Sequence, residues 1–270
     1  MVLKWIGGKG RYVETLAKYL PESFTGYKEP FLGGASFYFY LKRAGFLKHL
    51  KPADIILSDT NYELIVAYIG LQSPSRFAEV MSLLEFHKTS HNRFYFAAEK
   101  LKSYSTIEEV AARFLYFNRA CFSGIYRENK YGDFNVSDKK AGISWLPTID
   151  YLTAHYALKG ATIKCIDYSV LTEYLKPGDF VYLDPPYYSM VANGHRTVYG
   201  KAFRWEDHKD LKKFCDWCDD HGVLFMQSNS SEDVLWDLYD GYQINTMEVK
   251  YNPAGSAENL DQVDLIITNY

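Results

Sequence analysis

Short apolar runs alternate with amphipathic segments along most of the chain. Apolar runs bounded by polar and glycine-containing stretches predict seven strands, at residues 27–32, 54–58, 162–166, 180–183, 223–227, 243–249 and 263–268. Apolar positions at helical spacing predict helices at residues 9–20, 36–48, 61–72, 148–158, 206–221 and 231–239. This alternation predicts an α/β fold with a doubly wound sheet that binds ligands at the carboxyl ends of its strands. The last two strands have no helix between them, so we expect a terminal antiparallel hairpin.

The interval from residue 74 to residue 140 breaks the alternation. It contains three helical patterns, at 76–84, 93–101 and 107–117, and then a polar loop at 121–140. We interpret it as an inserted helical subdomain, which leaves 1–73 and 141–270 to form the main domain. The polar, glycine-containing stretch 188–202 is expected to be a mobile loop.

Composition excludes a membrane-spanning chain. The protein is 47% hydrophobic and 23% charged, and no segment approaches the roughly 18 continuous apolar residues of a membrane span. The first residues lack an apolar signal core, so we expect a cytoplasmic protein. The net charge of −3 argues against a protein that coats nucleic acid. However, residues 1–18 carry four basic side chains against one acidic, and residues 113–140 carry six against three, so contacts with a polyanion are expected there.

The cysteines and the aromatic residues bear on metal binding and on stacking with flat ligands. Cys215 and Cys218 have the spacing of a metal or redox pair, but they have no second pair and fall within a predicted helix, which favours two structural thiols and no metal. The chain has 24 Tyr and 17 Phe, and several tyrosines lie in polar, loop-like sequence, where they are suited to stacking on flat ligands or bases.

The most specific motif is Asp184-Pro185-Pro186-Tyr187, which directly follows the apolar strand at 180–183. Two prolines remove two backbone donors and fix an extended turn, so carbonyl oxygens point outward as acceptors. A carboxylate beside a rigid carbonyl can accept both hydrogens of an exocyclic amino group, and a tyrosine can stack on the base that carries it. The alternative is a Pro-Pro turn with a capping aspartate.

Four segments resemble Dam-type DNA adenine-N6 methyltransferases, in the order of that family. They are Lys4 to Lys9 (KWIGGK), Glu29 to Ser36 (EPFLGGAS), Phe114 to Val136 (with FLYFNR, GIYR and GDFNV) and the Asp184 motif. The resemblance covers nearly the whole chain. It implies a Rossmann-like methyltransferase sheet in which 74–140 is the inserted DNA target-recognition domain. It also implies S-adenosylmethionine as the methyl donor, with S-adenosylhomocysteine as its product and no metal, and methyl transfer to an adenine flipped out of double-stranded DNA.

The resemblance also implies a cofactor site. Gly33 and Gly34 lie in the turn between a predicted strand and the helix at Ser36, where glycine lets backbone approach a ligand. Asp59 takes the position of the carboxylate that binds the ribose hydroxyls, with a helix N-cap as its alternative role. The other expected cofactor residues are Trp5, Gly7, Gly8, Lys9, Phe31, Asp167 and Asp184.

For DNA, the resemblance places Phe122 where the family has the aromatic residue that fills the space of the flipped base. Ile125 and Arg127 match positions that read neighbouring bases, and Arg127 is suited to a guanine edge, although a solvated arginine is the alternative. Lys4 matches a lysine that reads a guanine. The remaining expected DNA contacts are Arg119, Ser123 and Asn135.

The sequence departs from the family pattern at three positions. Ala35 replaces the third glycine of the cofactor loop, Ser123 stands where the family often has Asn, and Ser137 where it often has Pro. The two serines leave open whether the target is the usual GATC. Two other functions also stay open: methylation of an amino group on RNA, protein or cytosine, and nucleic-acid binding without catalysis.

Overall fold

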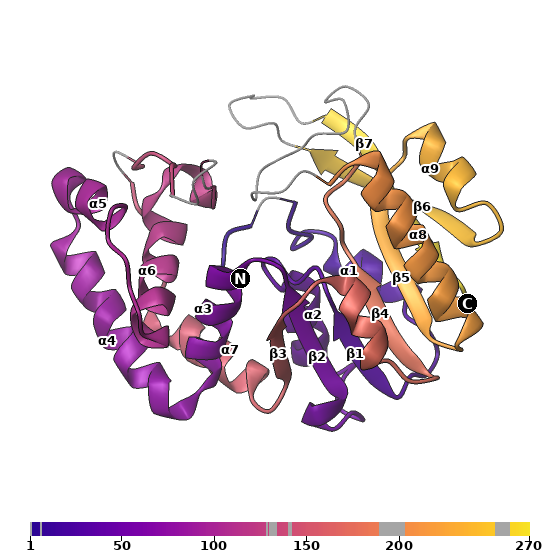
Figure 1. Ribbon diagram of the computed structural model, residues 1–270, viewed down its shortest axis with the longest axis horizontal. Helices are drawn as coiled ribbons and strands as arrows, with labels where there is room; N and C mark the ends of the chain where they lie inside the picture. The colour runs from indigo at the N-terminus through magenta and orange to yellow at the C-terminus, as the bar shows by residue number, and fades with distance from the viewer. Residues whose placement is uncertain are drawn as a thin grey trace.

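The computed structural model describes residues 2–5, 7–127, 129, 134–139, 142–188, 203–251 and 260–270. A seven-stranded sheet runs through the centre of the molecule in the order β3-β2-β1-β4-β5-β7-β6 (Figure 1). The first five strands of this order are parallel, and β7 is antiparallel to both of its neighbours. The strands are β1 (Gly26–Glu29), β2 (Ile55–Asp59), β3 (Thr162–Cys165), β4 (Asp179–Leu183), β5 (Leu224–Ser230), β6 (Gln243–Tyr251) and β7 (Leu260–Thr268).

All seven predicted strands form, and the terminal hairpin is confirmed. The order of its two strands was not predicted: β7 lies between β5 and β6, and β6 forms the edge of the sheet. The first strand is shorter than the predicted 27–32. It ends at Glu29 because Pro30 has no N–H to donate to a neighbouring strand, and the chain bends there into the glycine loop.

Helices cover both faces of the sheet, so the fold is the doubly wound α/β arrangement. Successive residues of β4 enter two separate hydrophobic clusters: Phe180 and Tyr182 pack on one face, and Val181 and Leu183 on the other. The first face is covered by α1 (Val13–Leu16), η1 (Ala17–Tyr19), α2 (Ser36–Ala44), α3 (Tyr62–Gln72) and α7 (Thr148–Leu158), and the second by η4 (Tyr168–Glu173), α8 (Trp205–Asp220) and α9 (Asp233–Leu238).

The helix prediction at 9–20 was wrong in extent, and one short helix was not predicted. A helix was expected at 9–20, but the segment forms the two short helices α1 and η1, because its first part, which contains Gly10, forms a turn in which the Tyr12 N–H donates to the Lys9 carbonyl. The short helix η4, between β3 and β4, was not predicted. The 3-10 turn η2 (Pro52–Asp54) precedes β2.

The interval from residue 74 forms the helices α4 (Pro74–Ser90), α5 (Arg93–Glu99) and α6 (Ile107–Ala120) and the turn η3 (Phe122–Gly124). They lie together at the left of Figure 1, beside α3. A capping box between Thr106 and Glu109 begins α6. Leu64 and Val66 of α3 share a hydrophobic cluster with Phe114 and Leu115 of α6, so the inserted helices are built onto the main core. Within the described ranges no helix is long and apolar enough to cross a bilayer.

Candidate functional site

The predicted catalytic and cofactor residues meet at one edge of the sheet. Asp184 follows β4, the glycine loop follows β1, and Asp59 ends β2, so all three lie at carboxyl ends of adjacent parallel strands. The order of the strands reverses between β1 and β4. This switch point is where doubly wound sheets bind their ligands.

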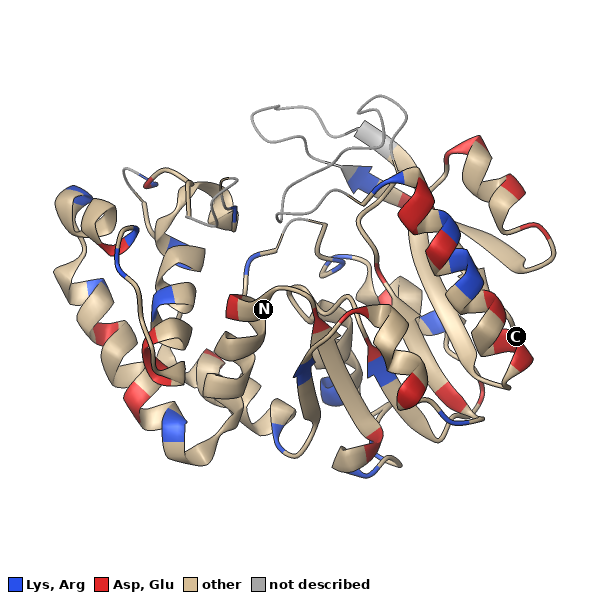
Figure 2. Cartoon of the chain, viewed as in Figure 1, with Lys and Arg blue, Asp and Glu red and all other residues tan. Residues whose placement is uncertain are grey.

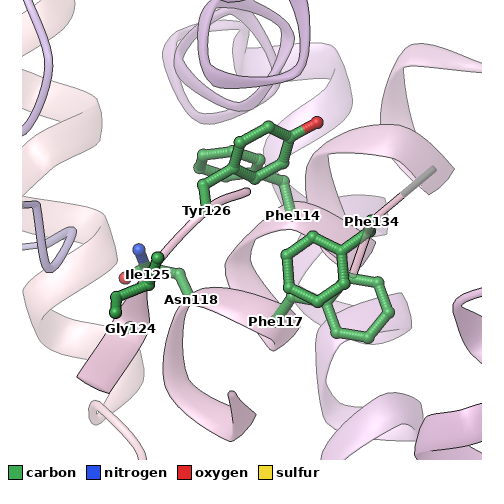
Figure 3. A pocket seen from close by; sticks show the side chains of 7 residues that line it. All are labelled: Phe114, Phe117, Asn118, Gly124, Ile125, Tyr126 and Phe134. Atoms are coloured by element: carbon green, nitrogen blue, oxygen red, sulfur yellow. The ribbon is translucent and has the colours of Figure 1, made fainter. Parts of the chain in front are cut away.

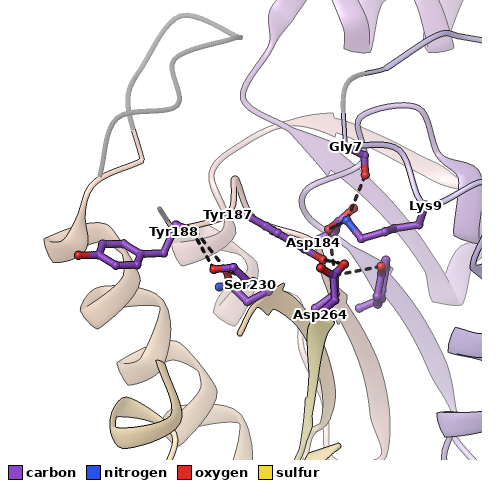
Figure 4. A network of polar contacts seen from close by, with 10 residues as sticks. Gly7, Lys9, Asp184, Tyr187, Tyr188, Ser230 and Asp264 are labelled. Carbon is purple, nitrogen blue, oxygen red and sulfur yellow. Dashed lines mark hydrogen bonds and ion pairs between the residues drawn. The ribbon is translucent and has the colours of Figure 1, made fainter. Parts of the chain in front are cut away.

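Asp184 is held by two side chains from distant parts of the chain (Figure 4). Lys9 Nζ lies 2.7 Å from Asp184 Oδ1 and also donates to the Gly7 carbonyl at 3.0 Å. The Ser228 hydroxyl, at the end of β5, donates to the same carboxylate oxygen at 2.9 Å. The Lys9 and Ser228 side chains are buried, whereas Asp184 is half-buried. The carboxylate is therefore fixed on its inner side and reaches the surface of the site.

The residues after Asp184 are fixed as well. Pro185 is buried and Pro186 is exposed. The Tyr187 hydroxyl donates to Asp264 Oδ2 at 2.8 Å, and Lys9 Nζ lies 4.2 Å from the centre of the Tyr187 ring. The Tyr188 N–H donates to Asn229 Oδ1 at 3.3 Å, and the Tyr188 carbonyl accepts from the Ser230 hydroxyl at 2.8 Å.

Asp59 holds the glycine loop in place. Its two carboxylate oxygens accept from the Gly33 N–H at 3.0 Å and from the Asn61 N–H at 2.9 Å. Burial raises the pKa of Asp59, and these backbone hydrogen bonds act in the opposite direction. Gly33 has φ 44°, and a Cβ there would lie 2.6 Å from the Trp5 indole, so only glycine lets the loop pack on Trp5.

The Asp59 carboxylate and the aromatic rings around this loop fit a ligand that carries hydroxyl groups and a flat ring. A carboxylate can accept more hydrogen bonds than the backbone N–H groups provide here, so Asp59 can also accept from a ligand hydroxyl. The Phe31 ring lies 5.4 Å from Tyr168 and 6.0 Å from Phe203, measured between ring centres. Asp167 is exposed and accepts from the Ser169 N–H and hydroxyl. In the described part of the chain no three His, Cys, Asp or Glu side chains lie close enough together to hold a metal ion, and Cys215 and Cys218 are both buried.

Glu29 is a further ionisable group at this edge. Its carboxyl group is 3% exposed and accepts from the Tyr27 hydroxyl at 2.6 Å. Its pKa is raised to about 8: burial is the largest cause and the charge of Asp184 acts in the same direction, while the hydrogen bond from Tyr27 acts against them. The motif contained Glu29, but the sequence did not identify it as a buried, neutral acid.

The expected DNA-reading segment begins with a tight turn. Ser123 (φ 56°, ψ 10°) and Gly124 (φ 68°) are both left-handed, and the Ile125 N–H donates to the Phe122 carbonyl at 3.2 Å. These values are those of a type I′ hairpin turn. The turn exposes Phe122 (53%) and Ser123, whereas Ile125 is half-buried.

Two extended segments, residues 125–127 and 134–138, lie beside this turn and pack on α6. The Phe122 N–H donates to the Ser137 carbonyl, and the Asn135 N–H to the Arg127 carbonyl. The exposed Arg127 donates from Nε to Asn135 Oδ1 at 2.8 Å. These segments and α6 enclose a small pocket (Figure 3). It is lined by Phe114, Phe117, Asn118, Gly124, Ile125, Tyr126 and Phe134.

Lys4 lies against this turn, although it is more than 100 residues away in sequence. Asn118 of α6 accepts from the Lys4 N–H and donates to the Lys4 carbonyl, both at 2.8 Å. A Cβ on Gly124 would lie 2.7 Å from Lys4 Cβ. The pKa of Lys4 is lowered by burial and by the charges of Arg119 and Lys139. The N-terminal segment and the turn therefore form one surface.

Besides Lys9, two of the basic residues expected to meet a polyanion are buried. Arg119 is 6% exposed and donates to the Val2 carbonyl at 2.7 Å, so it ties the N-terminus to α6 and is withdrawn as a DNA contact. Arg113 pairs with Glu63 at 2.9 Å. Figure 2 shows basic segments on α6 and in the N-terminal loop, and Lys130 and Lys140 lie outside the described residues. The basic surface is thus smaller than the count in the sequence implies.

Sequence reasoning missed Ser228, Asp264 and Asn118. Ser228 and Asn229 follow the predicted strand at 223–227, so the rule that ligands bind at strand ends was a signal that could have found them. Asn118 stands in the FLYFNR segment, but neither it nor Asp264 has a local mark of its role, since both act through contacts distant in sequence. The expected mobile loop at 188–202 lies outside the described residues from 189 on.

Residues 5–252 match the family model of the D12 class N6 adenine-specific DNA methyltransferases. The chain is 30% identical to the type II methyltransferase M.MjaIII of Methanocaldococcus jannaschii, over 99% of this chain and 98% of that protein. It is 29% identical to the type II methyltransferase M1.LlaDCHI of Lactococcus lactis subsp. cremoris, over 99% and 94%. It is 26% identical to the DNA adenine methylase of Vibrio cholerae, over 98% and 94%.

Proposed function

The chain belongs to the D12 class of N6 adenine-specific DNA methyltransferases, and we propose that it transfers a methyl group from S-adenosylmethionine to an adenine flipped out of double-stranded DNA. The observation that carries this proposal is the placement of Asp184 and Pro185 at the switch point of the sheet, with the carboxylate fixed by Lys9 and Ser228.

In the proposed reaction, Asp184 prepares the amine. The lone pair of adenine N6 is delocalised into the ring, so the nitrogen is a weak nucleophile. When the Asp184 carboxylate and the Pro185 carbonyl accept its two hydrogens, the nitrogen is drawn toward a pyramidal geometry with a localised lone pair. S-adenosylmethionine supplies the methyl group from its sulfonium. The Asp184 carboxylate is then in place to take the proton that the methylated nitrogen loses.

Tyr187 and Pro186 complete the proposed catalytic tetrad. The Tyr187 ring is fixed at its hydroxyl end by Asp264, and it offers a flat surface on which the flipped base stacks. Holding the base and the methyl donor in register removes much of the entropic cost of the reaction.

For the cofactor, we propose Asp59 as the acceptor of the ribose hydroxyls and Phe31 as one wall for the adenine ring, with the exposed Asp167 beside it. The backbone of Gly33 and Gly34 gives close approach to the ligand. The proposal also includes Trp5, Gly7, Gly8 and Lys9, which border the same loop or Asp184.

For DNA, we propose that the exposed Phe122 ring enters the space left by the flipped base. Arg127, positioned by Asn135, and Lys4, positioned by Asn118, then reach base edges on either side. Ser123 and Ile125 lie on the same turn. A GATC-like site is the proposed target.

Identifying the methylated product tests the function. Duplex DNA incubated with the protein and labelled S-adenosylmethionine is digested to nucleosides, and we expect the label in N6-methyladenine. RNA of the same sequence is the control and should remain unlabelled. Label in N4-methylcytosine or in the RNA would refute the substrate assignment.

Cofactor binding has a separate test. Asp59→Ala removes the proposed ribose acceptor, so calorimetry should give a Kd for S-adenosylmethionine at least about tenfold weaker, as expected for a lost hydrogen bond to a charged group. Asp167→Ala is the matched control for a carboxylate at the next strand end, and we expect a smaller loss. An unchanged Kd for Asp59→Ala would remove Asp59 from the site.

A further inference from the structure

Asp264 lies in contact with the catalytic tetrad, although it is 77 residues away in sequence. It belongs to β7, is 8% exposed, and accepts a hydrogen bond of 2.8 Å from the Tyr187 hydroxyl (Figure 4). Because β7 is antiparallel, its first half lies beside the end of β5, with Asp264 paired to Ser230. The terminal hairpin thus delivers a carboxylate to the edge of the sheet where the parallel strands end.

Burial of this carboxylate is unfavourable for the fold alone. Burial and the charge of Asp184 both raise the pKa of Asp264, against the effects of Lys9 and of the Tyr187 hydrogen bond. Packing at this position would be served equally well by an apolar side chain, which has no desolvation cost. A buried acid next to a second acid therefore indicates a role beyond stability.

The geometry around Tyr187 indicates what that role is. The two prolines fix the backbone that precedes the ring, but they leave the side chain free to rotate. Lys9 Nζ contacts one part of the ring surface, 4.2 Å from its centre. The hydrogen bond to Asp264 fixes the hydroxyl end of the Tyr187 side chain. Among the contacts of the described residues, it is the one that reaches Tyr187 from the terminal hairpin.

We propose that Asp264 is a positioning residue for methyl transfer, which holds the Tyr187 ring at the angle at which the target base stacks beside Asp184. This inference rests on the proposed function and assigns the terminal hairpin a part in it. Asp264 itself touches neither base nor cofactor. Its loss should lower kcat and leave the KM for S-adenosylmethionine nearly unchanged.

A double-mutant cycle tests the proposal. Asp264→Ala removes the acceptor, and Tyr187→Phe removes the donor but keeps the ring. We expect each change to lower kcat about tenfold, the effect of one lost charge-assisted hydrogen bond. The double variant should fall no further, because both changes remove the same contact. Asp264→Asn keeps an acceptor oxygen and should restore most of the activity.

Two further measurements separate positioning from damage to the fold. Gln262→Ala changes an exposed side chain two residues away on the same strand face and should behave as wild type in kcat and in thermal unfolding. With 2-aminopurine at the target position of the duplex, Asp264→Ala should alter the fluorescence of the bound base, since its stacking partner is no longer fixed.

The following results would overturn the proposal: losses of kcat in the two single variants that multiply in the double variant, an Asp264→Asn variant as slow as Asp264→Ala, or a parallel rise in the KM for the cofactor. Asp184→Ala distinguishes this failure from a failure of the proposed function. If Asp184→Ala is inactive while Asp264→Ala transfers normally, only the role of Asp264 is refuted. If Asp184→Ala stays active, the proposed function itself fails.

Discussion

Ala35 holds a left-handed backbone conformation (φ 52°, ψ 31°) at the start of α2. A Cβ in this region costs roughly 1–2 kcal/mol, because it approaches the following carbonyl oxygen. Ala35→Gly should therefore raise the free energy of unfolding by about 1 kcal/mol, measured by urea denaturation. Ala78→Gly, at an exposed position inside α4, is the control and should lower it by about 1 kcal/mol. A loss of stability in both variants would contradict the strain at Ala35.

Glu29 should make stability depend on pH. Its pKa is about 8 in the folded protein and 4.5 in the reference state, so between these values the folded state binds an extra proton. The free energy of unfolding then falls as pH rises, by at most about 1.4 kcal/mol per pH unit. Glu29→Gln removes this titration and keeps an acceptor for Tyr27. Urea midpoints measured from pH 5 to pH 8 should fall more steeply for wild type than for the variant; parallel curves would refute the buried neutral acid.

At the scale of elements, the N-terminal segment and the η3 turn should act together. A Cβ on Gly124 would lie 2.7 Å from Lys4 Cβ and 2.9 Å from the Asn118 carbonyl oxygen. Gly124→Ala should displace Lys4 and lower kcat/KM on the target duplex by at least about tenfold, as expected for a lost base contact. Gly241→Ala is the matched control, because Gly241 also has positive φ (96°) but has open space around it. Equal losses of activity in the two variants would contradict the coupling.

Arg127 lies in the extended segment that follows η3, and its proposed reading of a base can be tested. If Arg127 reads a guanine, Arg127→Ala should lose about 1–3 kcal/mol of discrimination at one position of the site. Binding to duplexes altered at single positions measures this loss. A uniform weakening across all duplexes, with a smaller salt dependence, would instead indicate a phosphate contact.

The sequence predicted most elements because their patterns are local. The seven strands and the helices α3, α7 and α8 were recovered to within a few residues, since apolar periodicity and β-branched runs encode them directly. The helix prediction at 9–20 was wrong because Gly10 favours a turn over a continuous helix. Burial of Arg119 was not predictable either, because a basic residue beside a polar loop has no local mark of its contact with Val2.

At the scale of the whole molecule, the site is assembled from segments that are distant in sequence. Lys9, Asp59, Asp184 and Ser228 come from the N-terminal loop and from the carboxyl-terminal ends of β2, β4 and β5. Two of the motifs contain Lys9 and Asp184, and the family resemblance indicated Asp59. Ser228 of β5 and Asp264 of β7 reach the site because of the order of the strands in the sheet. The chain pattern predicted a terminal hairpin but not that β7 would lie next to β5.

The inserted helices and the sheet share one hydrophobic cluster, which has a consequence for unfolding. Phe114 of α6 and Leu64 of α3 lie in it with Tyr182 of β4. We expect a single cooperative transition, so tryptophan fluorescence and far-ultraviolet circular dichroism should give coincident urea curves. Two separated transitions would show that the inserted helices unfold independently.

The central claim is that Asp184 acts on the target adenine. Its most direct test is the single-turnover rate of methyl transfer by Asp184→Ala, with cofactor and DNA saturating. The account predicts a folded variant that still binds both ligands and transfers at least about a hundredfold more slowly, as when an interaction made only in the transition state is removed. A single-turnover rate close to that of wild type would contradict the account.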